Sequence, residues 1–422
     1  MITKDDDNLV LAESITSVDE INAEFYGRFP YPWRSFKFDY LEDPDFETVM
    51  LNQDIGAWKH DRVPSEPRIW IAGCGTNQAV LTALRFPKAT VVGSDVSAGS
   101  LEICSETAKQ LGIKNLELRQ ESINQVPYHE EFDYIISTGV IHHNADPQTT
   151  LAKISGALKP DGVLELMVYN RFHWTVPAAF QKAIRLMSNG SAVNFDSELV
   201  IAKAIIGELP QETLIGIVSD YRELSDAMLA DELLQPVLHS YTVESLAEMA
   251  ASCGLEIILP CLNQFDKAEQ KYSWNIEFKN PVLKESYESL PDLKRWQITN
   301  LLLRERSPQL WFYFQRTDSS HTRRSEKEIC EEFLDTIFVQ SRTTQSSFIR
   351  KSDQGFRLLP KPISFPVKPA DNLVKKIVDA VDGCRPMGKI FRQLGPEMTM
   401  PVSRARAMLA SSAFPYLKAV QG

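Results

Sequence analysis

Cysteine is scarce in this chain and no long apolar run is present, and each absence excludes a class of protein. Only six of the 422 residues are cysteine, scattered without a CxxC pair or a cluster with histidine, which excludes a zinc site and predicts free thiols in a reducing compartment. The first residues lack the basic segment followed by an apolar one that marks a signal peptide. No run approaches the ~20 apolar residues of a membrane span. We therefore expect a cytoplasmic protein with neither a metal nor a membrane partner.

Positive charge is also limited. Lysine and arginine total 45 against 56 aspartates and glutamates, a formal net charge of 45 − 56 = −11. A dedicated nucleic-acid-binding protein needs a basic face, so we expect no nucleic-acid partner. The hydrophobic content of 43% is typical of a soluble globular protein, and the length allows more than one domain. The oligomeric state stays open.

One strand–turn–helix–strand pattern is the most informative feature that is present. An apolar strand over residues 68–72 runs into Gly73 and Gly75. A second apolar strand ends in Asp95. Glycine lets the backbone approach a ligand where a Cβ would clash, and an acid at that strand end can accept hydrogen bonds from ribose hydroxyls. A two-glycine turn alone is weak evidence, and Asp95 also suits a helix start with Ser97 as its cap, but the combination favours a nucleoside site.

The turn has two glycines, one fewer than a dinucleotide-binding turn. A dinucleotide site carries a third glycine three residues after the second, where this chain has Gln78. The turn is therefore too short to cradle a pyrophosphate at a helix N-terminus. The pattern predicts a nucleoside ligand without phosphates.

Alternating strands and helices extend this pattern into a fold. Short connections and near-continuous apolar strands indicate a parallel sheet covered on both faces. The predicted strands are about 68–72, 90–94, 115–119, 132–137 and 162–169, and the predicted helices are about 78–86, 98–111 and 147–158. Two further strands are expected at 255–262 and 309–315, and further helices at 176–187, 197–207, 212–230 and 242–252.

Changes in composition suggest four parts. They are an N-terminal arm or lid over 1–60, a core over 61–316 with helical insertions at about 171–240 and 263–308, a polar linker over 317–327, and a C-terminal accessory domain over 328–422. The last part is expected to be α or α+β. Residues 377–390 weakly resemble winged-helix modules that recognise a peptide or protein, and a structural or dimerising appendage is the alternative.

Four segments together resemble a known family. Ile-Ala-Gly-Cys-Gly-Thr-Asn at 71–77, Gly-Ser-Asp-Val-Ser at 93–97, the strand end at 132–143 and Leu-Lys-Pro-Asp-Gly at 158–162 occur in order and at suitable spacing. They are similar to class I S-adenosylmethionine-dependent methyltransferases over about residues 20–316. The resemblance implies a doubly wound, Rossmann-like sheet and S-adenosyl-L-methionine as the cofactor.

The resemblance also implies which residues hold that cofactor. The glycine turn would approach its methionine part, Asp95 its ribose, the segment after the third strand its adenine, and the segment after the fourth strand its sulfonium. The implied residues are Gly73, Cys74, Gly75, Asn77, Asp95, Val96, Glu121, Ser122, Ile123, Thr138, Gly139 and Val140. Asn77 departs from the glycine of many members, but asparagine tolerates a left-handed backbone. Glu121 is equally well a solvated loop charge, with the backbone of the next two residues making the contact.

Three residues are candidates for catalysis. His142 and His143 follow the fourth strand, where histidine can accept a proton near neutral pH. The alternative is that they only fix the loop. Tyr26 belongs to an aromatic arm whose faces suit a sulfonium cation. Packing of that arm on the core is the alternative.

Six residues are candidates for substrate contact. They lie in the arm or at the end of the fifth strand, on the edge where doubly wound sheets bind ligands. They are Tyr31, Trp33, Arg34, Tyr169, Arg171 and His173. Solvated arginines and packing at the sheet edge are the alternative explanation.

The predicted function is methyl transfer to an O, N or C atom of a small-molecule metabolite bound under the helical cap. Methylation of a peptide or protein recognised through residues 328–422 is one alternative. A non-catalytic cofactor-binding scaffold is another, and it would require a disabled cofactor site, whereas Gly73, Gly75 and Asp95 are intact. The acceptor does not follow from the sequence.

Overall fold

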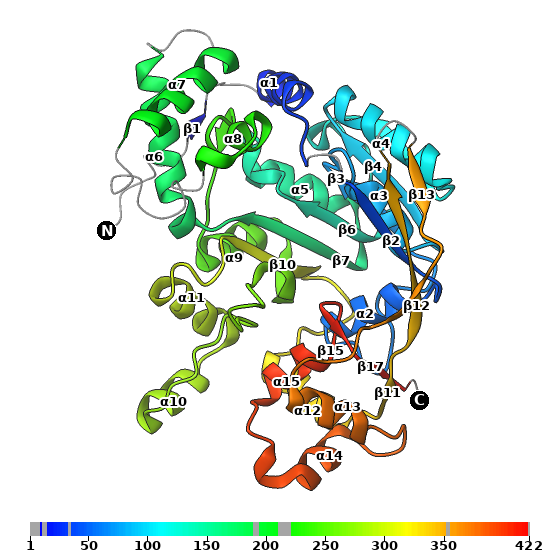
Figure 1. Cartoon of the computed structure of the whole chain (residues 1–422). Helices are drawn as coiled ribbons and strands as arrows, with labels where there is room; N and C mark the ends of the chain where they lie inside the picture. Colours follow the sequence, from blue (N-terminus) through cyan, green and yellow to red (C-terminus); the bar gives the residue numbers. More distant parts are fainter. Residues whose placement is uncertain are drawn as a thin grey trace.

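The computed structural model describes residues 9–10, 15–32, 35–188, 194–209, 221–351 and 355–420. A central sheet is flanked by helices, a helical cap lies at one end, and a C-terminal unit lies at the other (Figure 1). No described helix is long and apolar enough to cross a membrane. The described residues also contain no group of three or more histidine, cysteine, aspartate or glutamate side chains that could hold a metal ion.

The central sheet has seven strands in the order β5-β4-β3-β6-β7-β10-β9. Their bounds are β3 Arg68–Ala72, β4 Thr90–Asp95, β5 Leu116–Gln120, β6 Phe132–Thr138, β7 Leu158–Tyr169, β9 Leu255–Pro260 and β10 Gln309–Arg316. The first five in this order are parallel, and β10 runs antiparallel to both neighbours. The register between β6 and β7 shifts after Phe132, so residues 159–162 form a bulge inside the longer strand β7.

The sheet reverses its order beside β3, because β4 and β6 pair with opposite sides of that strand. Ligands of doubly wound sheets bind at the carboxyl ends of the strands at such a point. The strands that flank it are completely buried in their middles, with Ile69, Trp70 and Ile135 at 0% exposure. The fold therefore presents the loops after β3, β4 and β6 on one rigid edge.

Helices cover the sheet in two groups. On one side α3 and α4 pack against each other and against β4, and on the other α5, α9 and α11 form a contacting series. Their bounds are α3 Gln78–Arg85, α4 Ala98–Leu111, α5 Pro147–Ala157, α9 Val243–Ser252 and α11 Asp292–Leu302, with α2 Phe46–Asp54 and α10 Pro281–Glu288 nearby in the chain. The doubly wound, Rossmann-like prediction is confirmed.

The helical cap has its own apolar core. It contains α6 Arg171–Met187, α7 Phe195–Glu208 and α8 Asp226–Leu233, packed with α1 Ile15–Arg28. The rings of Phe25 and Phe195 meet edge to face with centroids 5.1 Å apart, which ties α1 to the cap. The short strands β1 Leu9–Val10 and β8 Val237–Leu238 also pair. Of the helix expected at 212–230, residues 226–230 lie in α8 and 212–220 fall outside the described residues.

The C-terminal unit combines helices and short strands. Its helices are α12 Glu326–Asp335, α13 Asn372–Ala380, α14 Met387–Leu394 and α15 Val402–Leu409. Its strands are β11 Phe338–Gln340, β12 Thr343–Arg350, β13 Phe356–Leu358, β14 Ile363–Phe365, β15 Ala410–Ser411, β16 Phe414–Pro415 and β17 Leu417–Ala419. Strand β12 pairs with β13, β14 and also with β2 Lys37–Leu41 from the other end of the chain. Nothing in the sequence indicated that last pairing.

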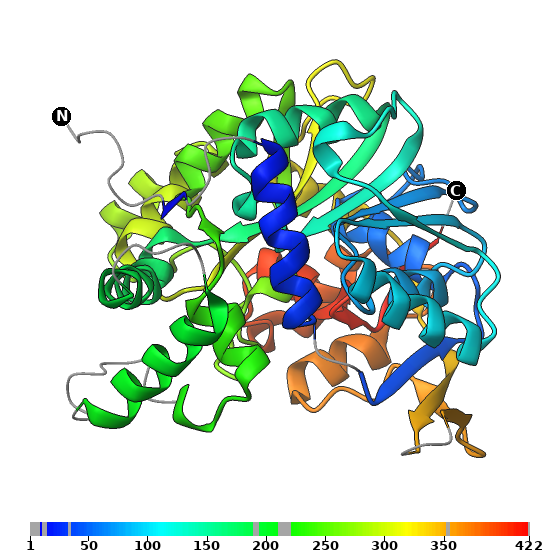
Figure 2. The same ribbon diagram turned by 90° about the horizontal axis from the view of Figure 1, so that it is seen from above.

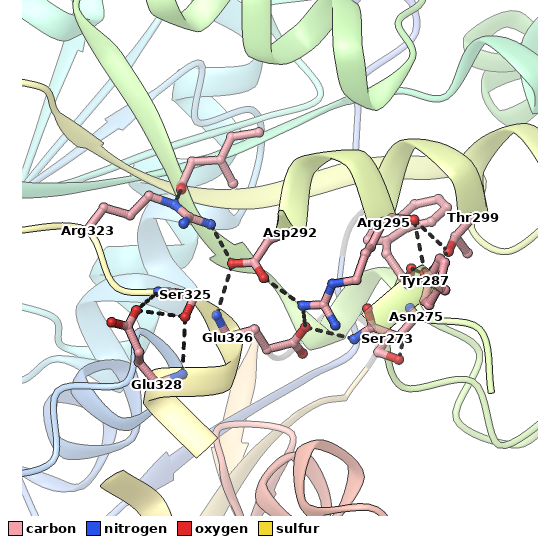
Figure 3. A network of polar contacts seen from close by, with 12 residues as sticks. Ser273, Asn275, Tyr287, Asp292, Arg295, Thr299, Arg323, Ser325, Glu326 and Glu328 are labelled. Atoms are coloured by element: carbon pink, nitrogen blue, oxygen red, sulfur yellow. Dashed lines mark hydrogen bonds and ion pairs between the residues drawn. The ribbon is translucent and has the colours of Figure 1, made fainter. Parts of the chain in front are cut away.

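The C-terminal unit shares its apolar core with the sheet domain. Trp58 packs its ring against Phe333 and Phe338 at 5.6 and 5.7 Å between centroids. The segment before α12 is held by polar contacts, shown in Figure 3. There Asp292 pairs with Arg295 at 2.6 Å and with Arg323 at 2.8 Å. Residues 317–327 are thus anchored to α11 at one point of the predicted linker.

Candidate functional site

A cavity of about 300 Å³ lies at the carboxyl ends of β3, β4 and β6. Every residue that the resemblance implied for the cofactor lines it: Gly73, Cys74, Gly75, Asn77, Asp95, Val96, Glu121, Ser122, Ile123, Thr138, Gly139 and Val140. Asp19, Asn22, Tyr26, Tyr31 and His143 line it as well. The cavity therefore joins the sheet edge to the N-terminal segment.

The two glycines of the turn are required by close neighbours. Gly73 has a φ of +82°, and a Cβ there would lie 2.5 Å from Cγ2 of Val140. Gly75 has a φ of +52°, and a Cβ there would lie 2.6 Å from the carbonyl oxygen of Tyr31. Both conformations disfavour L side chains. Gly73 keeps the loop after β6 close, and Gly75 lets the N-terminal arm lie directly on the turn.

Asp95 is fixed at the end of β4 by two backbone amides. The Gly75 N–H donates to Oδ2 at 2.8 Å and the Ser97 N–H donates to Oδ1 at 2.9 Å. Burial raises the pKa of Asp95, and these two hydrogen bonds oppose the rise. Ser97 also caps α4 by accepting from the Ser100 N–H, so both interpretations of this segment hold together. The carboxylate is oriented before any ligand arrives.

Helix α1 contributes Asp19, Asn22 and Tyr26 to the cavity lining. Figure 2 shows this helix lying across the molecule. Ser122 Oγ donates to Asp19 Oδ2 at 2.5 Å, and Asn22 Nδ2 donates to the His143 carbonyl at 2.8 Å. The other amide atom of Asn22, Oδ1, is buried without a partner in the described structure. A buried acceptor of this kind suits a ligand donor such as an amino group.

Sequence analysis missed Asp19 and Asn22. Both precede the sheet residues they contact by about 100 positions or more, as the Asp19–Ser122 separation of 103 shows. Neither belongs to a local pattern, and only their place on a helix near the aromatic arm pointed to the region.

Glu121 faces the cavity through a fixed side chain. Its Oε1 accepts a hydrogen bond from the hydroxyl of Tyr128. Arg119 in turn donates to the same tyrosine at 2.7 Å. The carboxylate is therefore anchored at the cavity rather than free in solvent.

The two histidines occupy different positions. His143 lines the cavity, and its Nδ1 lies 2.7 Å from the Val237 carbonyl, to which it donates. Burial lowers the pKa of His143 to about 4, and burial lowers that of His142 well below 6.5. His142 is fully buried and does not line the cavity; its ring packs on Tyr169, with centroids 3.9 Å apart. Both rings are therefore neutral and weakly basic near pH 7.

The predicted substrate residues are dispersed. Tyr31 lines the cavity and keeps 38% of its surface exposed. Tyr169 does not line the cavity, and its ring stacks on Trp174 with centroids 3.6 Å apart. Arg171 and His173 do not line the cavity. Arg171 donates to the Ser240 carbonyl, and His173 pairs with Glu305. Trp33 and Arg34 fall outside the described residues.

A group of polar residues adjoins the cavity, and the sequence had singled out its tyrosines but not its acids. We call Tyr26, Tyr31, Tyr169, Asp231 and Glu232 the tyrosine–acid cluster. Gln235 Nε2 donates to Asp231 Oδ1 at 3.1 Å and to the Tyr169 hydroxyl at 3.2 Å. Burial raises the pKa of Asp231 to about 7, and the charge of Glu232 adds to the rise. The charge of Asp231 helps to raise the pKa of all three tyrosines.

Comparisons with known proteins agree with this geometry. The profile of a family described as "Methyltransferase domain" matches residues 72–208. An uncharacterized protein of Synechococcus sp. is 26% identical over 68% of this chain and 69% of its own length. Trans-aconitate 2-methyltransferase of Deinococcus radiodurans is 32% identical over 32% of this chain and 49% of its own. A ubiquinone biosynthesis O-methyltransferase of Actinobacillus pleuropneumoniae is 33% identical, over 24% and 44%.

The chain spans about half the length of these two named methyltransferases. Among solved structures, PKMT2 from Rickettsia typhi in complex with AdoHcy matches 93% of this chain and 77% of its own, with a TM-score of 0.57 and 16% identity. That likeness establishes a shared fold that extends into the C-terminal unit.

Proposed function

We propose that this chain, whose residues 72–208 form a class I S-adenosylmethionine-dependent methyltransferase domain, transfers the methyl group to an O, N or C atom of a small-molecule acceptor. S-adenosyl-L-methionine is the cofactor, and when bound it supplies a methyl group on a sulfonium. The observation that carries the proposal is that one cavity gathers all twelve implied cofactor residues and continues to Tyr26 and Tyr31.

The residues of this cavity fit the cofactor. The glycine turn leaves room for its methionine part, and Asp95 presents oriented carboxylate oxygens to a ribose. Glu121 and the unpartnered Oδ1 of Asn22 are acceptors suited to an adenine amino group. Ring faces of Tyr26 and Tyr31 suit a sulfonium cation. Alignment of donor and acceptor supplies much of the rate of such a displacement.

The covered position of the cavity supports a small acceptor. Helix α1 lines it and is tied to the sheet edge by Asp19 and Asn22. The cap packs on α1 through Phe25. An acceptor must therefore reach the cofactor beside Tyr31, the exposed residue of the lining. A lid of this kind excludes water from the transfer.

The second candidate is methylation of a peptide or protein recognised through residues 328–422. The observation that favours it is the pairing of β12 with β2, which brings the C-terminal unit next to the arm that carries Tyr31. Point changes on the exposed face of β14, such as Ile363→Glu at 49% exposure, test it. They should leave use of a small acceptor unchanged and weaken use of a peptide acceptor only.

Calorimetric titration with S-adenosylhomocysteine tests the proposed function. Saturable binding by the full chain, lost in Asp95→Ala, is the expected result. Binding that is absent in the unaltered protein contradicts the methyltransferase assignment. Binding without release of S-adenosylhomocysteine from S-adenosylmethionine, across acceptors of every charge type, would instead favour the scaffold alternative.

A further inference from the structure

We propose that the methyl acceptor is an aliphatic amine that enters as its ammonium form, binds in the tyrosine–acid cluster, and gives its proton to Asp231. This inference rests on the proposed function and names the acceptor class of the same site. It assigns a role to three residues outside every motif of the sequence: Asp231, Glu232 and Gln235.

The cluster is placed where the acceptor must lie. Tyr26 and Tyr31 line the cofactor cavity, and both also feel the charge of Asp231. Tyr26 also packs on the apolar side chains of α8, the helix that carries Asp231. Gln235 links Asp231 to the hydroxyl of Tyr169, at the carboxyl end of β7. The cluster thus shares Tyr26 and Tyr31 with the cavity, and its acids lie next to that lining.

The charge of the cluster selects a cation. Two partly buried acids, Asp231 and Glu232, are adjacent in α8, and the charge of Glu232 helps to raise the pKa of Asp231. No arginine or lysine among the described residues is a cause of the Asp231 pKa shift. A carboxylate acceptor would add a third negative charge here, whereas an ammonium group would relieve the repulsion and face tyrosine rings.

The arginines of the cap do not neutralise this charge. Arg185 Nη2 donates to the Gln235 carbonyl at 2.6 Å, and its charge partner is Glu198. Arg171 Nη2 donates to the Ser240 carbonyl at 3.2 Å. Burial raises the pKa of Glu232, and two partners oppose the rise: the Tyr221 hydroxyl, which donates to it at 3.3 Å, and the charge of His173.

Asp231 is also the best proton acceptor near the cavity. A carboxylate with a pKa of about 7 can take a proton at neutral pH and release it again. The buried histidines are poorer bases, because the pKa of His143 is about 4 and that of His142 is lower than its ordinary value. A hydroxyl acceptor is neutral, so it would need one base to remove its proton. It would not need a second acid such as Glu232 to balance a positive charge.

The step balances in atoms and charge. The ammonium transfers one proton to the Asp231 carboxylate, which leaves a nitrogen lone pair. That lone pair attacks the methyl carbon, so an N–C bond forms as the S–C bond breaks. The products are S-adenosylhomocysteine and an N-methylammonium ion, and the proton on Asp231 passes to solvent after the product leaves.

The test uses the full chain saturated with S-adenosylhomocysteine and three probes of similar size: butylamine, butan-1-ol and butyrate. Tyrosine and tryptophan fluorescence follows occupancy of the cluster. Butylamine should bind saturably and at least ~10-fold more tightly than either other probe. Asp231→Asn should abolish this preference. Asp226→Asn is the matched control, an exposed acid of the same helix paired with Lys203, and should change nothing.

Every result of this experiment either supports or overturns the amine proposal. No saturable butylamine binding, a preference for butan-1-ol or butyrate, or a preference retained in Asp231→Asn overturns the amine proposal. Calorimetric binding of S-adenosylhomocysteine is measured on the same samples. Intact cofactor binding with a failed amine preference rejects the amine acceptor alone, whereas failed cofactor binding rejects the proposed function. Thermal unfolding of each variant establishes that it is folded.

Discussion

The floor and the roof of the cavity are built in different ways. The floor consists of loops that follow three adjacent parallel strands, and it meets a ligand mainly with backbone and with one acid, Asp95. The roof draws on α1, the arm, the end of β7 and α8, and it presents side chains: Tyr26, Tyr31 and Asp231. We therefore expect the floor to bind the cofactor and the roof to select the acceptor.

The acids of the floor and the roof, Asp95 and Asp231, also differ in how well the fold stabilises their charges. Both oxygens of Asp95 receive backbone hydrogen bonds, which oppose the rise in its pKa that burial causes. Asp231 has one amide donor and an acidic neighbour, and its pKa is raised to about 7. A poorly supported buried acid is typical of a functional site rather than of a structural ion pair.

The largest expected effect is at the floor. Asp95→Ala removes an oriented acceptor of the ribose, and hydrogen bonds to a charged group contribute about 1.5–3 kcal/mol each. We expect S-adenosylhomocysteine to bind at least ~100-fold more weakly, as measured by calorimetry. Asp226→Ala, on the exposed surface of α8, is the control. Unchanged affinity in Asp95→Ala would remove the basis of the comparison.

The second-largest expected effect distinguishes a steric clash in the cofactor turn from backbone strain alone. Gly73 and Gly112 both have positive φ, but a Cβ at Gly112 would meet nothing within 4 Å, whereas one at Gly73 would strike Val140. Gly73→Ala should weaken cofactor binding by ~10-fold or more. Gly112→Ala should cost only about 1 kcal/mol of folding stability. Equal cofactor affinities in the two variants would show that the turn is not at the ligand.

A comparable effect is expected at the roof in the pH dependence of turnover. With butylamine as acceptor, kcat/KM should rise ~10-fold between pH 6 and pH 8, because Asp231 must be ionised to hold the ammonium and its pKa is about 7. The tyrosines beside it and the histidines behind it do not titrate in this window. Asp231→Asn should lose this rise. A rise that persists in the variant would place the titrating group elsewhere.

The smallest effect concerns stability. The folded pKa of Asp231 lies above its ordinary value of 3.8, so the folded state holds this proton more tightly. Unfolding free energy therefore falls as pH rises from about 4 to 7, and the penalty stays above pH 7. Asp231→Asn should be more stable than the unaltered protein by about 1–2 kcal/mol at pH 8, and by less at pH 4.5. Urea titrations at both pH values measure this, and a gain that does not depend on pH would contradict the assignment.

The sequence predicted the floor and the two tyrosines of the roof, Tyr26 and Tyr31, but not its acid Asp231, for physical reasons. Strands such as β3 and helices such as α4 have the predicted bounds, because apolar runs, turns and caps are local signals. Asp231 shows no such signal: it is an ordinary acid in an amphipathic helix until α8 is packed against Tyr26 and Tyr169. Arg171 and His173, by contrast, looked like ligand residues from their place after β7, yet α6 begins at Arg171 and points both side chains to other partners.

The pairing of β2 with β12 limits how the arm can move. The carbonyl of Tyr31 accepts from the Thr76 N–H at 3.3 Å, and Lys37 is already paired with Ile349. The 37 − 31 = 6 peptide steps between these anchors span at most about 20 Å. The arm therefore has little slack between its contact with the glycine turn and its pairing with β12. The pairing of β2 with β12 therefore helps to hold Tyr31 against the glycine turn.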